Sequence, residues 1–254
     1  MLKIIRARFR QGHRTLAYPR ETPKLSERYL GRPQLAPSKC GKNCKRCMEK
    51  CPAAAIQAGD GKLSLDLGRC LFCGDCQAAC PSKAIQFTRD HRMAVRARQD
   101  LRLNGAEYAL AKALDEKARR LFGRSFKLRQ VSAGGCGACE ADINVLGTLV
   151  FDLGRFGIQI VASPRHADAL IITGPVTQNM VLALRKTHEA VPPPRLVIAV
   201  GACAISGGLY ADHPETTNGV ETHLPVDLYI PGCPPHPLTI LDGLLRLLGR
   251  LERP

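Results

Sequence analysis

The sequence predicts two structural classes in tandem: a small cysteine-rich α+β region, followed by a larger α/β region built on a parallel sheet. The twelve cysteines fall into two groups, eight between residues 40 and 80 and four between residues 136 and 233. The first group lies within an internal repeat. The second group is interspersed with alternating strand and helix patterns, which are typical of α/β proteins.

Residues 40–90 contain a repeat with a period of 29 positions. Its first copy is Cys44, Cys47, Cys51-Pro52 and Ile56, which return as Cys73, Cys76, Cys80-Pro81 and Ile85. From Cys70 onward the thiols follow the spacing Cys-x2-Cys-x2-Cys-x3-Cys-Pro, which is typical of bacterial iron–sulfur proteins. Zinc sites usually combine two separated Cys pairs or Cys and His pairs, so a structural zinc site is the weaker alternative.

These eight cysteines predict two [4Fe–4S] clusters. The fourth cysteine of each run is expected to bind the cluster of the other run. One cluster is therefore expected on Cys40, Cys44, Cys47 and Cys80, and the other on Cys70, Cys73, Cys76 and Cys51. The first run contains one extra residue between Cys40 and Cys44. A small bulge at Gly41 or Asn43 could absorb it, since both residue types tolerate unusual backbone angles.

We also make structural predictions for the other segments of the first half. Residues 1–39 carry ten Lys or Arg and four Pro against two acids, which predicts an extended basic arm. This arm either is a solvated tail or lies on a partner subunit or on membrane headgroups. The Gly59-Asp60-Gly61 sequence predicts a hairpin turn. Residues 91–125 are expected to form a helical connector that Asn104 caps and Gly123 ends, with one apolar face formed by Leu110, Leu114, Ala118 and Leu121.

Residues 126–254 alternate between strand and helix patterns. Strands are expected over 127–131, 158–162, Ala169–Thr173, Leu196–Val200 and 226–230. Ala169–Thr173 and Leu196–Val200 are continuous apolar runs, which are typical of buried parallel strands. A helix is expected over 140–150, and a second near the end has Leu241, Leu244, Leu245 and Leu248 on one face. The pattern predicts a doubly wound α/β arrangement.

The last four cysteines each follow a predicted strand and lie close to a glycine. They are Cys136, Cys139, Cys203 and Cys233. The carboxyl edge of an open α/β sheet is where such folds bind ligands, so these thiols are expected to converge there on a third [4Fe–4S] cluster. The alternative is that they are small buried hydrophobes, as free cysteines often are. Dinucleotide and phosphate-loop glycine patterns are missing, so neither flavin nor nicotinamide is expected.

The formal net charge of +15 requires an explanation. Thiolate-ligated clusters would offset part of it. The remainder could serve an acidic partner, an anionic membrane or nucleic acid. Because no aromatic residues interleave the basic ones, nucleic acid is not expected, although a basic iron–sulfur protein that binds nucleic acid stays an alternative. No run of 18 apolar residues and no secretory leader is evident. Twelve cysteines without an export signal favour metal ligation in a reducing cytoplasm over disulfides.

These motifs resemble a known family. The second half resembles the small subunit of membrane-bound, energy-converting [NiFe] hydrogenases of the formate hydrogenlyase type, and it is similar to the 20 kDa subunit of respiratory complex I. The first half resembles the two-cluster ferredoxin subunit of the same complexes, including Leu67-Gly68-Arg69-Cys70. One polypeptide would then fuse two subunits that are usually separate. The matching segments of the second half are residues 135–140, 163–168, 173–177, 201–203 and 231–235.

The resemblance implies an α+β ferredoxin-like 2[4Fe–4S] domain over 40–90 and an α/β flavodoxin-like domain with a parallel sheet over 126–254. It implies an electron-transfer subunit of a membrane-associated [NiFe] hydrogenase, or alternatively of a complex I-like quinone oxidoreductase or a nickel-free relative. In the complex I type the first two cysteines are adjacent. Here two residues separate Cys136 from Cys139, and Glu140 follows, which is closer to the hydrogenase side.

Such a chain would belong to an oxidoreductase but would not be catalytic alone, because all twelve cysteines are assigned to three [4Fe–4S] clusters and none remains for nickel. Its implied partners are a large subunit with a nickel–iron or related centre, membrane-arm subunits and an electron-donor subunit or ferredoxin. Its implied location is peripheral, on the cytoplasmic face of a membrane. Glu140 is either a proton relay or an acid favoured by the helix dipole. Arg165 and His166 are expected to shape the cluster environment or a partner interface, although His166 could be purely structural.

Overall fold

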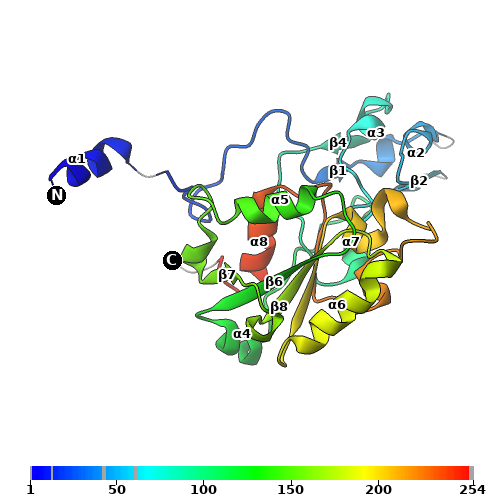
Figure 1. Cartoon of the computed structure of the whole chain (residues 1–254). Coiled ribbons are helices and arrows are strands. Elements are labelled where there is room, and N and C mark those ends of the chain that lie inside the picture. Colours follow the sequence, from blue (N-terminus) through cyan, green and yellow to red (C-terminus); the bar gives the residue numbers. More distant parts are fainter. Residues whose placement is uncertain (1, 13, 42–43, 60–61, 252–254) are drawn as a thin grey trace.

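Five parallel strands in the described part of the chain form the framework of the second half (Figure 1). The computed structural model describes residues 2–12, 14–41, 44–59 and 62–251. Every expected strand of this half is present, although two are shorter than the runs expected at 158–162 and 226–230. In the order β10-β9-β8-β6-β7 across the sheet, the strands are β6 (Phe126–Ser132), β7 (Ile158–Ile160), β8 (Ala169–Thr173), β9 (Leu196–Val200) and β10 (Leu228–Ile230).

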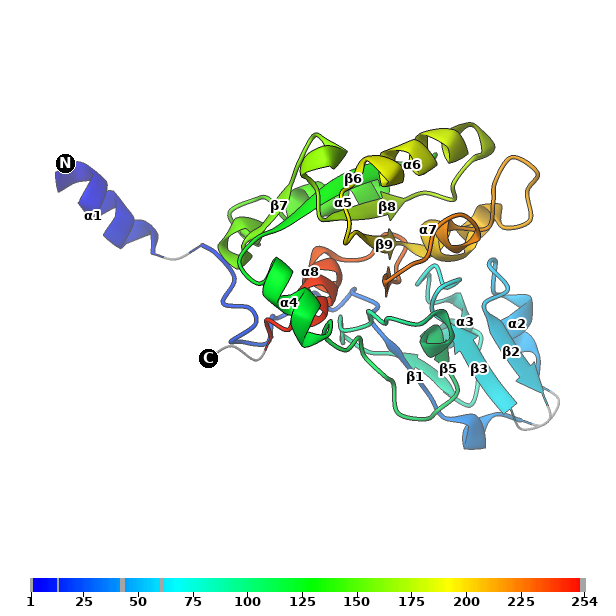
Figure 2. The same cartoon turned by 90° about the horizontal axis from the view of Figure 1, so that it is seen from below.

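Alternate residues of these strands enter two different cores, because successive side chains of a strand point to opposite faces. On one face, residues such as Leu128 and Ile171 pack against α5 (Ala138–Val145) and α8 (Pro237–Leu247). On the other face, Leu170 and Val197 pack against α6 (Gln178–Ala190), α7 (Ala202–Ser206) and the first half of the chain. Figure 2 shows α6 and α8 on opposite sides of the sheet. Strands β8 and β9 are buried at every position, as their apolar runs predict.

The first half is built from short antiparallel sheets and two single-turn helices. Strand β1 (Pro33–Leu35) pairs with β4 (Ile85–Phe87). Strands β2 (Ile56–Gly59), β3 (Lys62–Asp66) and β5 (Arg102–Leu103) form a second sheet. Gly59 pairs with Lys62, so the two strands are joined where a hairpin was expected. Asp60 and Gly61 of that turn lie outside the described residues.

The sequence repeat is also a structural repeat. Helices α2 (Arg46–Glu49) and α3 (Asp75–Ala78) begin 29 positions apart, as do β2 and β4. Even the backbone strain recurs, since Ala54 and Lys83 both have positive φ angles, of 46° and 52°. These non-glycine residues follow the Cys-Pro of each copy. They turn the chain from the last cysteine into the strand.

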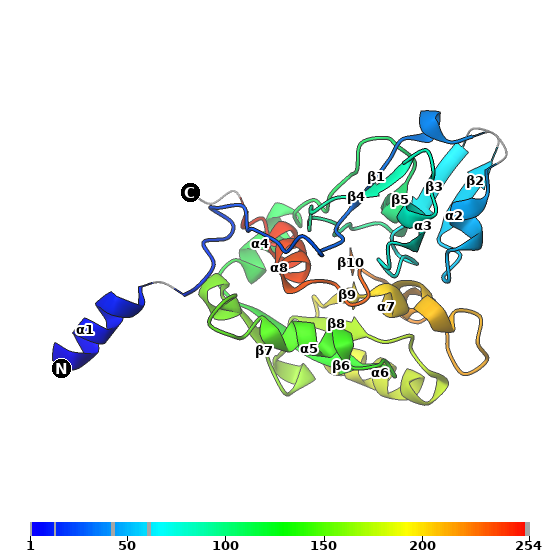
Figure 3. The same cartoon turned by 90° about the horizontal axis from the view of Figure 1, so that it is seen from above.

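The two halves share one core and pack along β10 and α7 (Figure 3). Val95 exchanges two backbone hydrogen bonds with Tyr229 of β10, of 3.0 and 2.8 Å. Ser206 at the end of α7 donates a hydrogen bond of 2.9 Å to the carbonyl of Gly68. The fused halves are therefore joined by backbone pairing, by side-chain hydrogen bonding and by apolar packing.

The N-terminal arm, which the sequence predicts to be extended, begins instead with a helix. Residues Leu2–Gln11 form helix α1, in which no residue is buried. This stretch contains neither Gly nor Pro, and helix-breaking Gly12 and Pro19 come later. Beyond α1 the arm lies along the second half, where the Leu16 amide donates to the carbonyl of Val150 at 2.9 Å.

The expected connector helix is wrong over most of its length. Only α4 (Glu116–Phe122) is helical, and its N-cap is Asp115, whose side chain accepts from the Ala118 amide at 2.9 Å. Asn104 instead closes a local turn by accepting from the Ala106 amide. Hydrogen bonds to distant segments of the chain explain why the rest of this connector is not helical. The amides of Ala111 and Leu114 donate to the carbonyls of Ala94 and Leu247, so they are not available for a helix. Gly123 ends α4 as expected.

Candidate metal centres

The eight cysteines of the first half line two separate cavities. This division is the one that the crossed ligand pattern of the sequence predicts. Apolar residues, among them Ile56, Leu65, Leu63 and Ile85, complete the two linings. The first cavity is lined by Cys40, Cys44, Cys47 and Cys80, and the second by Cys51, Cys70, Cys73 and Cys76.

Backbone amides are directed at several of these sulfurs. The Ala55 amide donates to Cys51 Sγ at 3.3 Å, and the equivalent Ala84 amide donates to Cys80 Sγ at 3.2 Å. Such hydrogen bonds stabilise a thiolate and tune the reduction potential of an iron–sulfur cluster. The two bonds are 29 positions apart, so each copy of the repeat builds the same local environment for its last cysteine.

Burial disfavours free thiolates in these cavities. Cys70 and Cys76 are buried, and burial raises the pKa of each thiol to about 12. Both groups are therefore protonated at neutral pH until a metal replaces the proton. Among the described residues, no group of three or more His, Cys, Asp or Glu is arranged to hold a single metal ion.

The other four cysteines converge at the carboxyl edge of the parallel sheet. Cys136 and Cys139 follow β6, Cys203 follows β9 and Cys233 follows β10. Burial first, and then the neighbouring thiols of Cys233 and Cys136, raises the pKa of Cys203 to about 11. Burial and all three other thiols likewise raise the pKa of Cys139. Cys136 and Cys233 are exposed, so this group of thiols opens to the protein surface.

Two glycines leave space beside these sulfurs. Gly201 has a φ of +89°, and a Cβ placed there would lie 2.6 Å from Cys139 Sγ. Gly208 has a φ of +58°, and its Cβ would lie 2.9 Å from Cys203 Sγ. Any side chain at either position would therefore collide with one of these sulfurs. The donor chemistry and this clearance fit a cysteine-ligated cluster. The sequence pointed to the glycine beside Cys203 but not to Gly208, which stands five residues after it.

Glu140 is held by hydroxyl groups. Thr173 donates to its Oε1 at 2.6 Å, and Glu140 lies in the first turn of α5. Burial opposes ionisation, but hydrogen bonds from Ser132 and Thr173 outweigh it, and the pKa of this carboxyl lies below its usual range. A carboxylate anchored in this way favours the helix-terminus alternative over the proton relay.

Arg165 and His166 are exposed on a 3-10 turn, Pro164–His166, that precedes β8. This turn leads into the amino end of its strand, whereas the cysteine loops follow the carboxyl ends. The exposure suits the partner-interface alternative. Asp168 in the same motif has a role that the sequence did not reveal: its Oδ2 accepts from the Lys127 amide at 2.7 Å and links β8 to β6. Asp227 links β10 to β9 in the same way.

A second feature that sequence reasoning missed joins the cysteine groups. The Asp66 carboxylate accepts from the Gly68 amide at 2.8 Å and receives both ends of the Arg98 guanidinium at 2.9 and 2.7 Å. Gly68 then accepts from Ser206, three residues after Cys203. We call these four residues the Gly68 junction. It connects the segment before Cys70 with the helix that carries Cys203.

This arrangement is that of an iron–sulfur protein of the electron-carrying class. Residues 136–247 match the family described as the NADH ubiquinone oxidoreductase, 20 Kd subunit, and residues 39–85 match the 4Fe-4S dicluster domain. The chain belongs to the 20 kDa subunit family of NADH ubiquinone oxidoreductase, with an iron–sulfur region preceding that domain. The resemblance predicted from the sequence is thereby confirmed for both halves.

Curated relatives come from two kinds of complex. The chain is 39% identical over 134 residues to the probable membrane-bound hydrogenase subunit mbhJ of Pyrococcus furiosus, covering 53% of this chain and 80% of that protein. It is 43% identical over 130 residues to formate hydrogenlyase subunit 7 of Escherichia coli, covering 51% of each. It therefore spans about half the length of the latter.

A third relative is a subunit of the NADH-quinone oxidoreductase of Heliobacterium modesticaldum, 40% identical over 123 residues, with 48% of this chain and 70% of that protein covered. A solved structure of the membrane-bound sulfane sulfur reductase, an archaeal respiratory membrane complex, includes a chain that is 33% identical, with a TM-score of 0.47 over 55% of this chain and 77% of that chain. The curated relatives are subunits of oxidoreductase complexes, and this chain is an oxidoreductase subunit of the same family.

Proposed function

We propose that the chain is the electron-relay subunit of a membrane-bound hydrogenase complex and that it carries three [4Fe–4S] clusters. The observation that carries this proposal is the grouping of all twelve cysteines into three sets of four, two in cavities of the first half and one at the sheet edge. The clusters supply one-electron transfer. The chain's own residues provide thiolate ligands, backbone N–H groups that donate to the sulfurs, and apolar side chains that exclude water.

Two finer features of the fold support the same proposal. The strand order of the parallel sheet is that of flavodoxin-like proteins, whose ligand site lies at the switch point beside the first strand. In this chain the first strand is β6, and Cys136 and Cys139 follow it. The repeat-related helices α2 and α3 and the crossed cysteine sets are features of a two-cluster ferredoxin.

The connections between the cysteine sets support a route for electrons through the chain. The Gly68 junction links the segment of Cys70 to the helix of Cys203. The Cys136 set opens to the surface through Cys136 and Cys233. We infer that, with clusters bound to these thiols, electrons would pass in either direction between a donor subunit or ferredoxin at the first half and a large subunit, with its nickel–iron or related centre, at the exposed edge.

A complex I-like quinone oxidoreductase is the second candidate, since a subunit of an NADH-quinone oxidoreductase is among the relatives. The spacing of Cys136 and Cys139, with Glu140 after them, favours the hydrogenase alternative. The large subunit that co-purifies decides between them. Two Cys pairs and bound nickel in that subunit support the hydrogenase, and their absence supports the quinone-linked complex.

Helix α1 suits a peripheral position on the membrane, on the cytoplasmic side. Its residues Leu2, Ile5 and Phe9 follow the i, i+3, i+7 pattern of one helical face and are all exposed. Lys3, Arg6 and Arg10 follow the same spacing on another face, and the helix contains no acid. A basic amphipathic helix of this kind binds in the plane of an anionic membrane. No helix in the described residues is long and apolar enough to cross a bilayer.

The test is anaerobic reconstitution of the full chain followed by iron and sulfide analysis with electron paramagnetic resonance. Three clusters correspond to about twelve irons per chain. Replacing Cys203 with Ser is expected to remove about four of them and to leave the signals of the other two clusters. The isolated chain is expected to hold no nickel and to evolve no hydrogen. An iron content near eight in the unaltered, fully reconstituted chain would contradict the third cluster.

A further inference from the structure

The two cysteine sets of the first half have equivalent thiols but different surroundings. We call the thiols of the first cavity the Cys40 set and those of the second cavity the Cys51 set. Arg46 and Ser82 belong to the lining of the first cavity. Apart from its thiols, the described lining of the second cavity holds no ionisable side chain. The sequence repeat allows a position-by-position comparison, because equivalent residues of the two copies lie 29 positions apart.

Three exposed cations lie beside the Cys40 set. Lys45 is the N-cap of α2 and Arg46 is its first residue, in the helix that carries Cys47. Lys83 comes from the other copy of the repeat and follows Cys80 by three positions. The equivalent positions beside the Cys51 set are Gly74, Asp75 and Ala54. The same three positions therefore carry three positive charges beside one set and one negative charge beside the other.

Other charged residues near the two runs leave this contrast unchanged. Each run begins after a basic residue, which is Lys39 in the first copy and Arg69 in the second. On α2 and its C-cap, Glu49 and Lys50 carry opposite charges, and their counterparts are uncharged. If the cations served only to offset the charge of ligand thiolates, both sets would need them. The Cys51 set has the same number of thiols without them, so the cations at the Cys40 set require another explanation.

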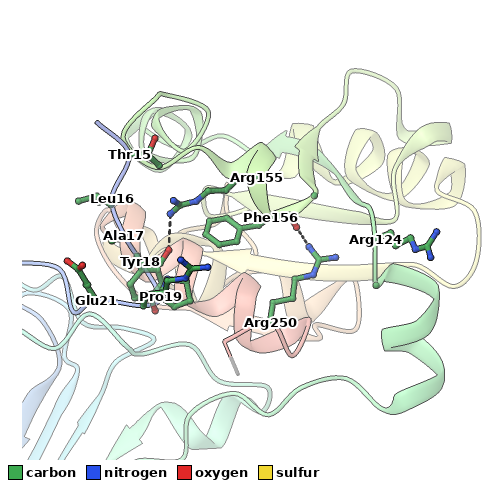
Figure 4. A pocket seen from close by; sticks show the side chains of 13 residues that line it. Thr15, Leu16, Ala17, Tyr18, Pro19, Glu21, Arg124, Arg155, Phe156 and Arg250 are labelled. Atoms are coloured by element: carbon green, nitrogen blue, oxygen red, sulfur yellow. Dashed lines mark hydrogen bonds between the residues drawn. The ribbon is translucent and has the colours of Figure 1, made fainter. Parts of the chain in front are cut away.

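These cations have no partner within the described chain. No carboxylate lies within 4.0 Å of the charged groups of Lys45, Arg46 or Lys83. Arginines elsewhere hold segments of the chain together. In the cavity of Figure 4, Arg155 donates to the Tyr18 carbonyl at 2.8 Å. The three cations beside the Cys40 set make no such internal bond and are available to another molecule.

We propose that Lys45, Arg46 and Lys83, which we call the Cys40 rim, dock an acidic electron-carrier protein; this inference rests on the proposed electron relay. Opposite charges on two proteins steer their encounter and fix their orientation. A carrier on this rim would lie against the cavity of the Cys40 set, where Cys40 and Cys80 are only half-buried. Helices α1 and α2 lie at opposite ends of the molecule in Figures 1, 2 and 3, so a membrane bound by α1 would not cover the rim.

The test uses the full, reconstituted chain and an acidic [2Fe–2S] ferredoxin as the probe. Calorimetry at low ionic strength measures binding. Freeze-quench electron paramagnetic resonance measures electron exchange, because it separates [2Fe–2S] from [4Fe–4S] signals. The rim variant Lys45→Gln/Arg46→Gln/Lys83→Gln is expected to bind at least about tenfold more weakly and to exchange electrons correspondingly more slowly. Added salt should reduce the difference from the unaltered chain.

A matched control removes the same charge elsewhere. Lys112→Gln/Lys117→Gln/Lys186→Gln changes three exposed lysines outside the cysteine-rich region and is expected to bind the ferredoxin like the unaltered chain. Equal losses in the rim and control variants, or unchanged binding of the rim variant, would overturn the proposal. So would a lack of binding to the unaltered chain. Weaker flotation of the rim variant with phosphatidylglycerol vesicles would assign the rim to a membrane instead.

A small reductant separates this proposal from the electron relay on which it rests. A sulfonated viologen without net charge does not depend on the rim, so it is expected to reduce the clusters of all three proteins equally. If it reduces no cluster in the unaltered chain, the proposed relay itself is wrong. If it reduces all three proteins equally while ferredoxin binding is indifferent to the rim, the relay stands and only the docking proposal fails.

Discussion

The hydroxyl of Ser206 donates a 2.9 Å hydrogen bond to the carbonyl of Gly68, across 138 positions of sequence. Gly68 stands two residues before Cys70, and Ser206 stands three residues after Cys203. A Cβ at Gly68 would lie 2.8 Å from Ile205 Cγ2 and 2.9 Å from the Arg98 guanidinium. The two halves are therefore in direct contact at the point where two of the proposed clusters would exchange electrons.

Substitution at this contact is expected to weaken the joint between the halves. Gly68→Ala should lower the free energy of unfolding by about 1–3 kcal/mol, because it overpacks a closed contact. Ser206→Ala should lower it by about 1 kcal/mol. Urea unfolding of the loaded chain measures both, and paramagnetic broadening between clusters reports any change in their separation. Gly147→Ala is the control, since its Cβ would meet only an ordinary contact at 3.5 Å. Equal effects at Gly68 and Gly147 would argue against the junction.

Gly201→Ala is expected to abolish the third cluster selectively. The new methyl group would lie 2.6 Å from Cys139 Sγ, at a φ of +89° that already disfavours side chains. Iron analysis should fall from about twelve to about eight per chain. Gly137→Ala separates the two causes, because Gly137 has a φ of +86° but nothing within 4 Å of its Cβ position. A full complement of iron in the Gly201 variant would count against the assignment of Cys139 as a ligand.

Tyr18→Phe is expected to loosen the arm. The Tyr18 hydroxyl donates to Oδ1 of Asp242, a residue with 0% exposure, whose other oxygen accepts from Arg246 at 2.7 Å. Removing the hydroxyl leaves one buried carboxylate oxygen without this donor, at a cost of about 1–3 kcal/mol. Thermal unfolding measures the loss, and limited proteolysis near residues 12–25 detects a freed arm. Tyr210→Phe at an exposed position should behave like the unaltered chain.

Stability is expected to fall as the pH drops below about 7. Burial lowers the pKa of His91, and Arg92 and Arg246 add to this effect, while Asp242 and Asp90 oppose it. Burial also lowers the pKa values of His188, His223 and His236. The unfolded chain therefore binds protons near pH 6.5, before the folded chain does, and proton binding to the unfolded chain reduces stability.

His91→Gln tests the contribution of His91 to this pH effect, since His91 is buried and only 5% exposed. Urea unfolding at pH 7.5, 6.5 and 5.5 should give a shallower decline for the variant than for the unaltered chain. His166→Gln, at an exposed position, should leave the decline unchanged. If the free energy of unfolding declined equally with falling pH in all three proteins, His91 would be excluded as the source of the decline.

Helix α1 is expected to contribute most of the membrane affinity. The double variant Ile5→Asp/Phe9→Asp places two acids on the apolar face and should abolish flotation with phosphatidylglycerol vesicles. Removing Lys3 and Arg6 charges with Gln should weaken flotation by about 1 kcal/mol for each residue, and added salt should mimic that loss. Undiminished flotation of the Asp variant would mean that α1 binds a protein partner instead.

Much of the fold could be predicted where burial is continuous in sequence. The runs Ala169–Thr173 and Leu196–Val200 became strands with the expected bounds, because every side chain in them is buried. The crossed cysteine pattern gave the division of thiols between the two cavities of the first half. These strands and this division of the cysteines depend on the spacing of residues along the sequence, so they can be predicted without a structure.

Other features depend on contacts between distant segments. The connector pattern resembled a long helix, but the amides of Ala111 and Leu114 bond to strand and helix residues elsewhere in the chain. In the sequence, Ser206 is an ordinary polar residue near a helix end. Its hydrogen bond to the other half of the chain is seen only in the structure.

The bridge between Val95 and Tyr229 has a consequence for how the chain avoids self-association. An open sheet exposes unpaired amides and carbonyls along both outer strands, and these can template strands from other molecules. The Val95 backbone occupies both groups of Tyr229 on β10, while β7 at the opposite side spans only Ile158–Ile160. In the described residues the sheet therefore offers another molecule little unpaired backbone onto which it could add a strand.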